Sequence, residues 1–446
     1  MELFGSSGTR GTVGEAMTPS LVLRVARAAG TVWDADRVAI GRDTRTSGEM
    51  LADAAASGLT SVGVDVSRLG VLPTPGVAAR CAREGVPAVV VTASHNPADY
   101  NGLKLIDDEG VELTVDALER VEAHVFDRPV DEARWDEVGR VRAVDDACQA
   151  YVADLVDAVG DVDLGLTVAL DPGHGAGALT SPAFLRELGC RVVTVNGAPD
   201  GHFPGREPEP VPANLTDLRR LVRATDADVG VAHDGDADRA VFVDERGEAV
   251  PGESSLAALC AAALEPGDAV VSAVNVSSRV VDVVEAADAR LELTPIGATN
   301  IVTRVRELRR EGVRVPVAGE GNGGVFFPED RLARDGALAA ARFLSLVAER
   351  PASEVVAPYR DYHAVRRNLP YENDDERAAI LASARAYAEA TGADLNTVDG
   401  YRMAFADGWL LVRPSGTEPV VRVYAEATDP DRAADLADDA VAAVSP

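Results

Sequence analysis

The sequence predicts an α/β fold built from more than one domain. Short apolar runs rich in valine alternate with segments of helical periodicity along most of the chain, which is typical of sheets covered by helices. After about residue 355 this alternation stops, because a long helix precedes three closely spaced strands and a second helix. The chain has 446 residues, enough for about three or four domains of ordinary size.

Composition and charge narrow the range of functions. The chain holds 73 acidic and 43 basic residues, a formal net charge of −30, which argues against nucleic acid and anionic membranes as partners. No apolar run approaches the roughly 18–20 residues that span a bilayer, and no secretory signal is visible, so we expect a cytoplasmic protein. The acidic excess also predicts a halophilic protein, since salt screens the self-repulsion of the chain.

The first candidate site follows a buried strand. The run 86–91 is apolar and rich in valine, and it ends in the polar loop Thr92–Pro97. Ligands of open α/β sheets bind at such strand ends, so Ser94 is a candidate nucleophile with His95 beside it. An ordinary turn is the alternative, because serine and histidine are frequent neighbours in loops.

Two other features of the N-terminal part point to an anion. Phe4–Gly11 combines glycines, hydroxyls and Arg10, a composition that suits a loop facing an anion, although a simple terminal turn would look the same. Tyr100–Lys104 is predicted to be a hairpin turn that runs into a strand. Lys104 is the only lysine among the 43 basic residues, and lysine, unlike arginine, can be tuned to exchange protons. A lysine that survives there by chance is the alternative.

A polar linker, from about Asp127 to Val144, leads to a second β/α segment. The segment contains a strand over 228–232, and three aspartates at alternate positions follow it: Asp234, Asp236 and Asp238. On an extended chain these carboxylates point to one side, where they would repel one another without a hard cation such as Mg²⁺. A solvated acidic turn is the alternative, and an EF-hand is disfavoured because Arg239 stands where that loop needs glycine.

The third and fourth segments each carry one more candidate loop. Gly319–Gly324 is rich in glycine and lets a ligand approach the backbone, with Glu320 and Asn322 available for sugar hydroxyls. A plain glycine-rich turn is the alternative there. In the last segment, two predicted strands flank Arg413–Pro419, whose guanidinium, hydroxyls and amide groups are typical of a phosphate clamp, with a decorative hairpin as the alternative. We expect Arg422, in the following strand, to alternate toward the same anion.

Taken together and in this order, these motifs resemble the α-D-phosphohexomutase superfamily over nearly the whole chain. The resemblance implies three related mixed α/β domains and a smaller α+β C-terminal domain around a central active-site cleft, with one loop from each domain. We expect the phosphoserine, metal-binding, sugar-recognition and phosphate-binding loops to lie in domains that span residues 1–144, 145–250, 251–355 and 356–446, respectively.

The resemblance also implies a role for each motif. Ser94 would bear the transferred phosphoryl group, and one Mg²⁺ would be held by Ser94 together with Asp234, Asp236 and Asp238. The other catalytic residues around Ser94 would be Arg10, His95 and Lys104. The substrate would be bound by Arg239, Glu320 and Asn322, and its non-reacting phosphate by Arg413, Ser415, Gly416, Thr417 and Arg422.

The reaction implied is an isomerisation by intramolecular phosphoryl transfer. Hexose 6-phosphate and hexose 1-phosphate would interconvert through phosphorylated Ser94 and a hexose 1,6-bisphosphate, which is intermediate and activator. Glucosamine phosphate is the expected substrate, and mannose or glucose phosphate is the alternative. A phosphomonoesterase and a non-catalytic sugar-phosphate-binding protein are alternatives of other classes, and the chain is expected to be a monomer or a homodimer.

One loop departs from the family's pattern. The family's sugar loop often reads Gly-Glu-x-Ser-Gly-His, whereas this chain reads Gly-Glu-Gly-Asn-Gly-Gly, so Asn322 takes the hydroxyl position and Gly324 the histidine position. Any role of that histidine as a proton carrier or phosphate ligand is vacant, or is filled by another residue such as Lys104 or His95. This form of the loop is similar to archaeal members, in agreement with the high-salt composition.

Overall fold

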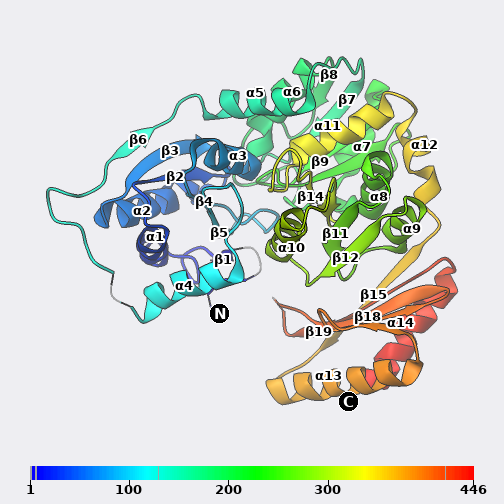
Figure 1. The fold of residues 1–446 in the computed structure, drawn as a ribbon. Coiled ribbons are helices and arrows are strands. Elements are labelled where there is room, and N and C mark those ends of the chain that lie inside the picture. Colours follow the sequence, from blue (N-terminus) through cyan, green and yellow to red (C-terminus); the bar gives the residue numbers. More distant parts are fainter. Residues whose placement is uncertain (1–2, 6–7, 129, 417, 446) are drawn as a thin grey trace.

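The computed structural model describes residues 3–5, 8–128, 130–416 and 418–445. These residues form four sheets, each from its own stretch of the chain. In Figure 1 the first sheet lies on the left, the second and third lie to its right, and the fourth, in orange and red, lies below the third. The predicted fold class, three mixed α/β units followed by a smaller unit of different architecture, is confirmed.

The first sheet has the strand order β1-β5-β4-β2-β3-β6. Its strands are β1 (Thr9–Thr12), β2 (Arg37–Arg42), β3 (Asp65–Val71), β4 (Ala88–Val91), β5 (Tyr100–Ile106) and β6 (Val141–Ala143). Its helices are α1 (Pro19–Trp33), α2 (Gly48–Ser61), α3 (Thr74–Glu84) and α4 (Val115–Phe126). The central strands run parallel, while β5 is antiparallel to both β4 and β1.

Two local predictions in this part are wrong. Tyr100–Lys104 is no hairpin turn but lies within β5, and Gly102 is needed because a Cβ there would stand 2.3 Å from the carbonyl oxygen of Thr9 on β1. The polar stretch expected to be only a linker contains β6, which adds a short exposed strand to the edge of the sheet beside β3. The residues near Gly102 and near β6 do not by themselves reveal these two features, because each depends on pairing with a strand that is distant in sequence.

The second and third sheets repeat a common plan in which parallel strands end in one antiparallel strand. The second has the order β10-β9-β7-β8 and comprises β7 (Thr167–Asp171), β8 (Arg191–Thr194), β9 (Val229–His233) and β10 (Ala240–Asp244). The third has the order β12-β11-β13-β14 and comprises β11 (Ala269–Ala273), β12 (Arg290–Thr294), β13 (Ala318–Gly319) and β14 (Val325–Phe326).

Helices join these sheets into one body. They are α5 (Ala147–Val159), α6 (Ser181–Glu187), α7 (Thr216–Thr225), α8 (Gly252–Ala263), α9 (Ser278–Ala286), α10 (Ala298–Arg310), α11 (Gly336–Val347) and α12 (Ala352–Val356). Although α11 follows the third sheet in sequence, it packs on β9 and β10 of the second, where Phe343 stacks on Phe242 at 4.0 Å between ring centroids. One continuous apolar core therefore extends from the first sheet through the third.

The C-terminal part forms an antiparallel sheet of order β15-β19-β18-β17-β16 with its own core. Its strands and helices are β15 (His363–Pro370), β16 (Asp394–Asn396), β17 (Tyr401–Phe405), β18 (Gly408–Pro414), β19 (Val420–Ala427), α13 (Asp374–Thr391) and α14 (Pro430–Val444). The buried Glu426 ties this sheet to the start of α9, because it accepts 2.6 Å hydrogen bonds from the hydroxyl of Ser277 and the amide of Ser278. Among the helices of the described residues, none is long and apolar enough to cross a membrane.

Candidate active site

Ser94 occupies a strained and buried position directly after β4. Its φ of +52° lies in the left-handed region, which is uncommon for a residue with a side chain and which recurs at functional sites. The amide of Ser94 donates to the hydroxyl of Thr92 at 2.8 Å, and its own hydroxyl donates to Oδ2 of Asp234 at 2.6 Å. Nδ1 of His95 lies 3.3 Å from the same hydroxyl oxygen.

A buried arginine that sequence reasoning did not single out holds this loop in shape. The guanidinium of Arg45 donates to the carbonyl oxygens of Ser94 at 2.9 Å and Asn96 at 2.6 Å, and it pairs with the carboxylate of Asp43 at 3.0 Å. Asp43 also accepts a 2.7 Å hydrogen bond from Thr92. Arg45 comes from the loop after β2, so two neighbouring strand ends build the position of Ser94 together.

The acidic cluster follows β9 in the second sheet and faces Ser94. One carboxylate oxygen from each of Asp234, Asp236 and Asp238 lies within 4.8 Å of the others, and all three residues are buried. The segment is a turn rather than the extended chain expected from the alternating spacing, with Ala237 at a φ of +56°. The turn comes so close to the serine loop that a Cβ on Gly235 would stand 2.6 Å from the carbonyl oxygen of Ser94.

The acidic cluster has carboxylate oxygens available for a cation. Oδ2 of Asp236 accepts a hydrogen bond from Thr74 at 2.6 Å, and Oδ2 of Asp238 accepts one from Lys104 at 2.8 Å. Among the described residues, none donates a hydrogen bond to the buried Oδ1 of Asp236 or of Asp238. Buried carboxylate oxygens without donors, next to a serine hydroxyl, fit a hard cation with oxygen ligands such as Mg²⁺.

The pKa values of two carboxyl groups in the acidic cluster, Asp234 and Asp238, shift in opposite directions. Burial, with the neighbouring Asp238 and Asp236, raises the pKa of Asp234 to about 8. Burial acts in the same sense on Asp238, but the cations Arg334, Lys104 and Arg239 outweigh it and hold the pKa of that carboxyl below its usual value. Without a bound cation, burial and the neighbouring carboxylates therefore favour the protonated form of Asp234, the carboxyl group that contacts Ser94.

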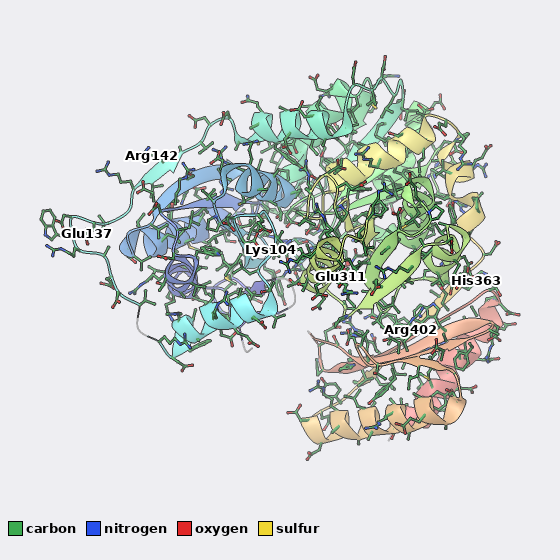
Figure 2. All side chains as sticks on the ribbon, viewed as in Figure 1. Lys104, Glu137, Arg142, Glu311, His363 and Arg402 are labelled. Carbon is green, nitrogen blue, oxygen red and sulfur yellow. The ribbon has the colours of Figure 1, made fainter. Side chains whose placement is uncertain are left out.

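Lys104, labelled in Figure 2, lies on β5 and is buried where the first sheet meets the acidic turn after β9. Its Nζ lies 2.8 Å from Asp238 and 3.2 Å from Asp236, with Glu112 at 3.4 Å. Burial alone would lower the pKa of Lys104, but these three carboxylates raise it above its ordinary value. A role of this lysine in proton exchange stays a prediction, and in the metal-free site its ammonium group pairs with the carboxylates around it.

Three more predicted residues meet at this centre. Arg10, on β1, donates to Oδ1 of Asn96 at 3.0 Å, and the amide of Arg239 donates to Oδ1 of Asp234 at 3.2 Å. Burial, followed by the charges of Arg239 and Arg10, lowers the pKa of His95 to about 2. The neutral form of the imidazole is therefore favoured.

The sugar loop lies beside the acidic turn. The amide of Ala240, at the start of β10, donates to the carbonyl oxygen of Gly323 at 3.0 Å. Within the loop, Oδ1 of Asn322 accepts the amide of Gly324 at 3.0 Å, and its Nδ2 lies 3.5 Å from the carboxylate of Glu320. Asn322 therefore shapes the loop as well as standing at its predicted ligand position.

The two clamp arginines are directly opposite each other on neighbouring strands, Arg413 on β18 and Arg422 on β19. Arg413 pairs with Asp399 at 3.0 Å, and Arg422 pairs with Glu418 at 2.5 Å. Both partners lie in turns between strands of the C-terminal sheet. The hydroxyl of Ser415 accepts the amide of Glu418 at 3.3 Å, which closes the turn, and Gly416 is exposed. Thr417 lies outside the described residues.

The structure thus gathers most predicted catalytic residues from two sheets into one buried centre around Ser94. Sequence reasoning missed the residues that support this centre: Asp43, Arg45, Thr74, Glu112 and Arg334. Two of these, Asp43 and Arg45, lie in the polar loop 43–47 between β2 and α2, and the position of this loop after a strand was the one signal available.

A serine in a strained loop, a buried acidic cluster and a ring of fixed cations define an enzyme of phosphoryl transfer. Models of the four phosphoglucomutase/phosphomannomutase domains match the chain in order: α/β/α domain I at residues 1–130, domain II at 149–247, domain III at 252–362 and the C-terminal domain at 368–443. The chain belongs to the phosphoglucomutase/phosphomannomutase family and is a phosphohexomutase, an isomerase.

Known proteins similar to the chain agree with this assignment over its full length. A probable phosphoglucosamine mutase of Methanopyrus kandleri is 41% identical over 443 residues, which cover 98% of this chain and 96% of that relative. A phosphoglucomutase/phosphomannomutase of Thermococcus kodakarensis is 39% identical, with 97% and 96% covered. The crystal structure of a family protein from Burkholderia thailandensis has a TM-score of 0.87 at 29% identity, covering 99% of this chain and 97% of that one.

Proposed function

We propose that the chain interconverts hexose 6-phosphate and hexose 1-phosphate through a phosphoserine at Ser94. The phosphoryl group of phosphorylated Ser94 passes to the free hydroxyl of a hexose phosphate: the bond from phosphorus to the serine oxygen breaks, the bond to the sugar oxygen forms, and the proton of the sugar hydroxyl ends on the oxygen of Ser94. This gives a hexose 1,6-bisphosphate, and the other phosphoryl group then returns to Ser94 by the reverse of the same step. The observation that carries this proposal is the buried 2.6 Å contact between Ser94 and Asp234, at the edge of an acidic cluster with unused carboxylate oxygens.

The acidic cluster is proposed to hold one Mg²⁺. Its ligands would be Asp234, Asp236, Asp238 and the phosphorylated side chain of Ser94, all oxygen donors. When bound, such an ion neutralises charge on the transferring phosphoryl group. Thr74 supports this arrangement from α3, because its hydroxyl fixes the other carboxylate oxygen of Asp236.

Enzymes of phosphoryl transfer act mainly by positioning the reactants and neutralising their charge, because the transition state is loose and requires little covalent chemistry from the protein. Lys104, Arg10 and Arg239 are proposed to supply fixed positive charge to the phosphoryl group, because they contact Asp238 of the acidic cluster and Asn96 of the serine loop. His95 is neutral and offers a ring nitrogen to the oxygen of Ser94. These residues are proposed to hold the phosphoryl group in line rather than to shuttle protons.

The clamp of the C-terminal sheet is proposed to bind the phosphate that does not react. Its residues are Arg413, Ser415, Gly416, Thr417 and Arg422. Holding the far end of the sugar aligns the acceptor hydroxyl with phosphorylated Ser94, which lowers the entropic part of the barrier. Glu320 and Asn322 are proposed to contact sugar hydroxyls between the two phosphate sites. The bisphosphate has to turn over between transfers, and it is proposed to act also as the activator that loads Ser94.

Glucosamine phosphate is the proposed substrate, because the relative at 41% identity is named a probable phosphoglucosamine mutase. The relative at 39% identity is named a phosphoglucomutase/phosphomannomutase, which favours glucose and mannose phosphates as the second candidates. The oligomeric state, monomer or homodimer, stays a prediction.

A coupled assay with Mg²⁺ in molar KCl tests the proposal on glucosamine 1-phosphate, glucose 1-phosphate and mannose 1-phosphate. We expect isomerisation, with the glucosamine compound turned over fastest. Release of free phosphate would instead indicate a phosphatase. Binding without any turnover, in folded protein supplied with a bisphosphate, would favour a non-catalytic sugar-phosphate-binding protein.

A further inference from the structure

The sugar loop has a glycine at position 324, and the side chain of Arg334 occupies the space that a larger residue at this position would need. A Cβ built on Gly324 would stand 2.8 Å from Cδ of Arg334 and 3.1 Å from Oδ1 of Asn322. A larger residue at position 324 therefore conflicts with Arg334 where it now lies. A side chain at position 324 and the side chain of Arg334 would compete for the same space, and in this chain Arg334 occupies it.

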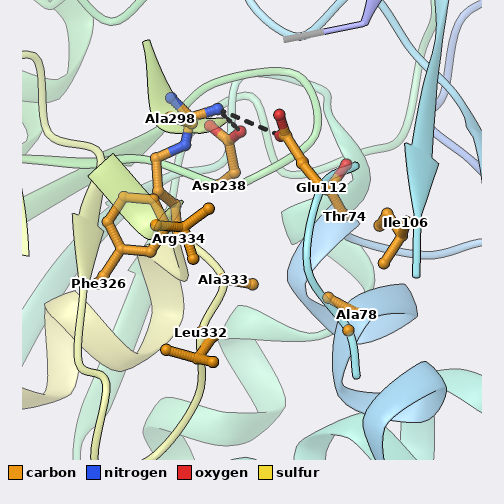
Figure 3. Close-up of a pocket in the computed structure, with 12 residues that line it drawn as sticks. Thr74, Ala78, Ile106, Glu112, Asp238, Ala298, Phe326, Leu332, Ala333 and Arg334 are labelled. Atoms are coloured by element: carbon orange, nitrogen blue, oxygen red, sulfur yellow. Dashed lines mark hydrogen bonds and ion pairs between the residues drawn. The ribbon is translucent and has the colours of Figure 1, made fainter. Parts of the chain in front are cut away.

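Arg334 extends from this volume into the phosphoryl-transfer centre. Its side chain is buried, its Nη2 donates to Oδ2 of Asp238 at 2.7 Å, and the same nitrogen lies 3.8 Å from Oε1 of Glu112. Figure 3 shows the guanidinium pointing at these two carboxylates, which come from different loops.

The backbone around Arg334 is fixed against the acidic turn. The amide of Gly336, the first residue of α11, donates to the carbonyl oxygen of Ala237 at 3.2 Å, and a Cβ on Gly336 would stand 2.3 Å from the carbonyl oxygen of Arg239. Asp335 caps α11 and accepts a 2.9 Å hydrogen bond from the hydroxyl of Tyr151. Arg334 therefore presents its guanidinium from a rigid position.

We propose that Arg334 binds the phosphoryl group under transfer and takes the place that the sugar-loop histidine holds in relatives with the Gly-Glu-x-Ser-Gly-His form. A guanidinium keeps its proton, so its contribution is fixed charge and hydrogen bonding, not proton exchange. Lys104 holds the same oxygen of Asp238 at 2.8 Å, so that carboxylate keeps a partner when Arg334 is removed. This inference rests on the proposed mutase reaction.

The test compares Arg334→Gln and Arg334→Lys with the wild type, using the best hexose phosphate and saturating Mg²⁺. We expect Arg334→Gln to lose about a hundredfold or more in kcat while KM changes by less than about threefold, as for a group that acts mainly on the transition state. Arg334→Lys keeps the charge, and we expect it to remain within about tenfold of the wild type. Arg342→Gln, which removes a half-exposed arginine on α11, is the matched control and leaves kcat unchanged.

A second readout separates this role from support of the metal site. Calorimetric titration of the sugar-free protein with Mg²⁺ is expected to give dissociation constants within about threefold for wild type and Arg334→Gln, because Lys104 still holds Asp238. Loss of Mg²⁺ binding in Arg334→Gln would assign Arg334 to the metal site and overturn the inference. So would an Arg334→Gln enzyme with nearly wild-type kcat, or an Arg334→Lys enzyme no better than Arg334→Gln.

An exchange variant keeps the inference testable if Arg334→Gln folds poorly. Gly324→His combined with Arg334→Gly returns a side chain to the shared volume from the other position, and we expect it to exceed Arg334→Gly alone by about tenfold or more in kcat. Equal kcat values for the double variant and for Arg334→Gly alone would contradict the proposal that Arg334 takes the place of the sugar-loop histidine. A wild-type chain inactive on all three sugar phosphates would contradict the proposed function itself, whereas an active wild type with an equally active Arg334→Gln contradicts only this inference.

Discussion

The hydroxyl of Ser94 and Oδ2 of Asp234 are joined by a 2.6 Å hydrogen bond across 140 residues of sequence. Both side chains are buried, and each follows a strand of a different sheet. This contact makes the serine loop and the acidic turn one site. The chemistry of the site therefore depends on how closely the two loops approach each other.

The glycine at position 235 tests this close approach. In Gly235→Ala, the added methyl would stand 2.6 Å from the carbonyl oxygen of Ser94, so the two loops have to separate. We expect a loss of about 1–3 kcal/mol in the free energy of unfolding, as for overpacking. A loss of about a hundredfold in kcat is also expected, because a displacement of about 1 Å misaligns the reacting groups. Urea denaturation and the mutase assay measure the two effects, and unchanged kcat would show that the contact is dispensable.

Arg45 is predicted to stabilise the serine loop more than any surface ion pair. Arg45→Met leaves Asp43 buried with its charge partner removed, and we expect a loss of about 3–5 kcal/mol in unfolding free energy. Replacing both residues, in Asp43→Asn with Arg45→Met, is expected to recover part of that loss. Urea denaturation distinguishes this from a loss below about 1 kcal/mol, the value typical of an exposed pair, which would contradict the assigned role.

Binding of Mg²⁺ is predicted to release a proton. The folded-state pKa of Asp234, about 8, lies above its unfolded value, so its contribution to the stability of metal-free protein is full at acid pH and is lost as the pH rises toward 8. A cation at the acidic cluster has to displace that proton, so at pH 7 we expect about one proton released per ion bound. Calorimetry in two buffers of different ionisation enthalpy counts it. Asp234→Asn is the control, and equal proton release from this variant would place the proton elsewhere.

The acidic composition predicts stabilisation by salt. With 73 acidic against 43 basic residues, the folded chain repels itself in dilute buffer, and molar KCl screens that repulsion. We expect the melting temperature, followed by far-UV circular dichroism, to rise from dilute buffer to molar KCl. Equal melting temperatures in both solutions would exclude the halophilic interpretation.

The parts of the site that could be predicted from sequence are those with a local pattern. Ser94 and the three aspartates each follow a short buried strand, and parallel strands bring their carboxyl ends to one edge, where ligands bind. The resemblance to a family added the roles and the order of the loops. The geometry of the acidic turn could not be predicted, because its bend depends on contacts with Thr74 and Gly336 from other elements.

Features without a local pattern were missed. Arg45 and Arg334 are single arginines in loops, and their partners come from distant segments. Gly102 follows Asn101 as in a hairpin turn, yet it is needed for the close approach of β1. Helix α11 is buried on most of its faces, so its sequence lacks the alternation of apolar and polar residues that marks an amphipathic helix. Strand β6 is short and exposed, and only its pairing with β3 defines it.

The most direct test of the account is the covalent state of Ser94. Wild-type protein and Ser94→Ala, each incubated with a hexose 1,6-bisphosphate and Mg²⁺ in molar KCl, are compared by peptide mass spectrometry and by mutase turnover. We expect one phosphoryl group on Ser94 of the wild type, none elsewhere, and a loss of turnover by several orders of magnitude in Ser94→Ala. Turnover by Ser94→Ala, or phosphorylation at another residue, would contradict the central claim.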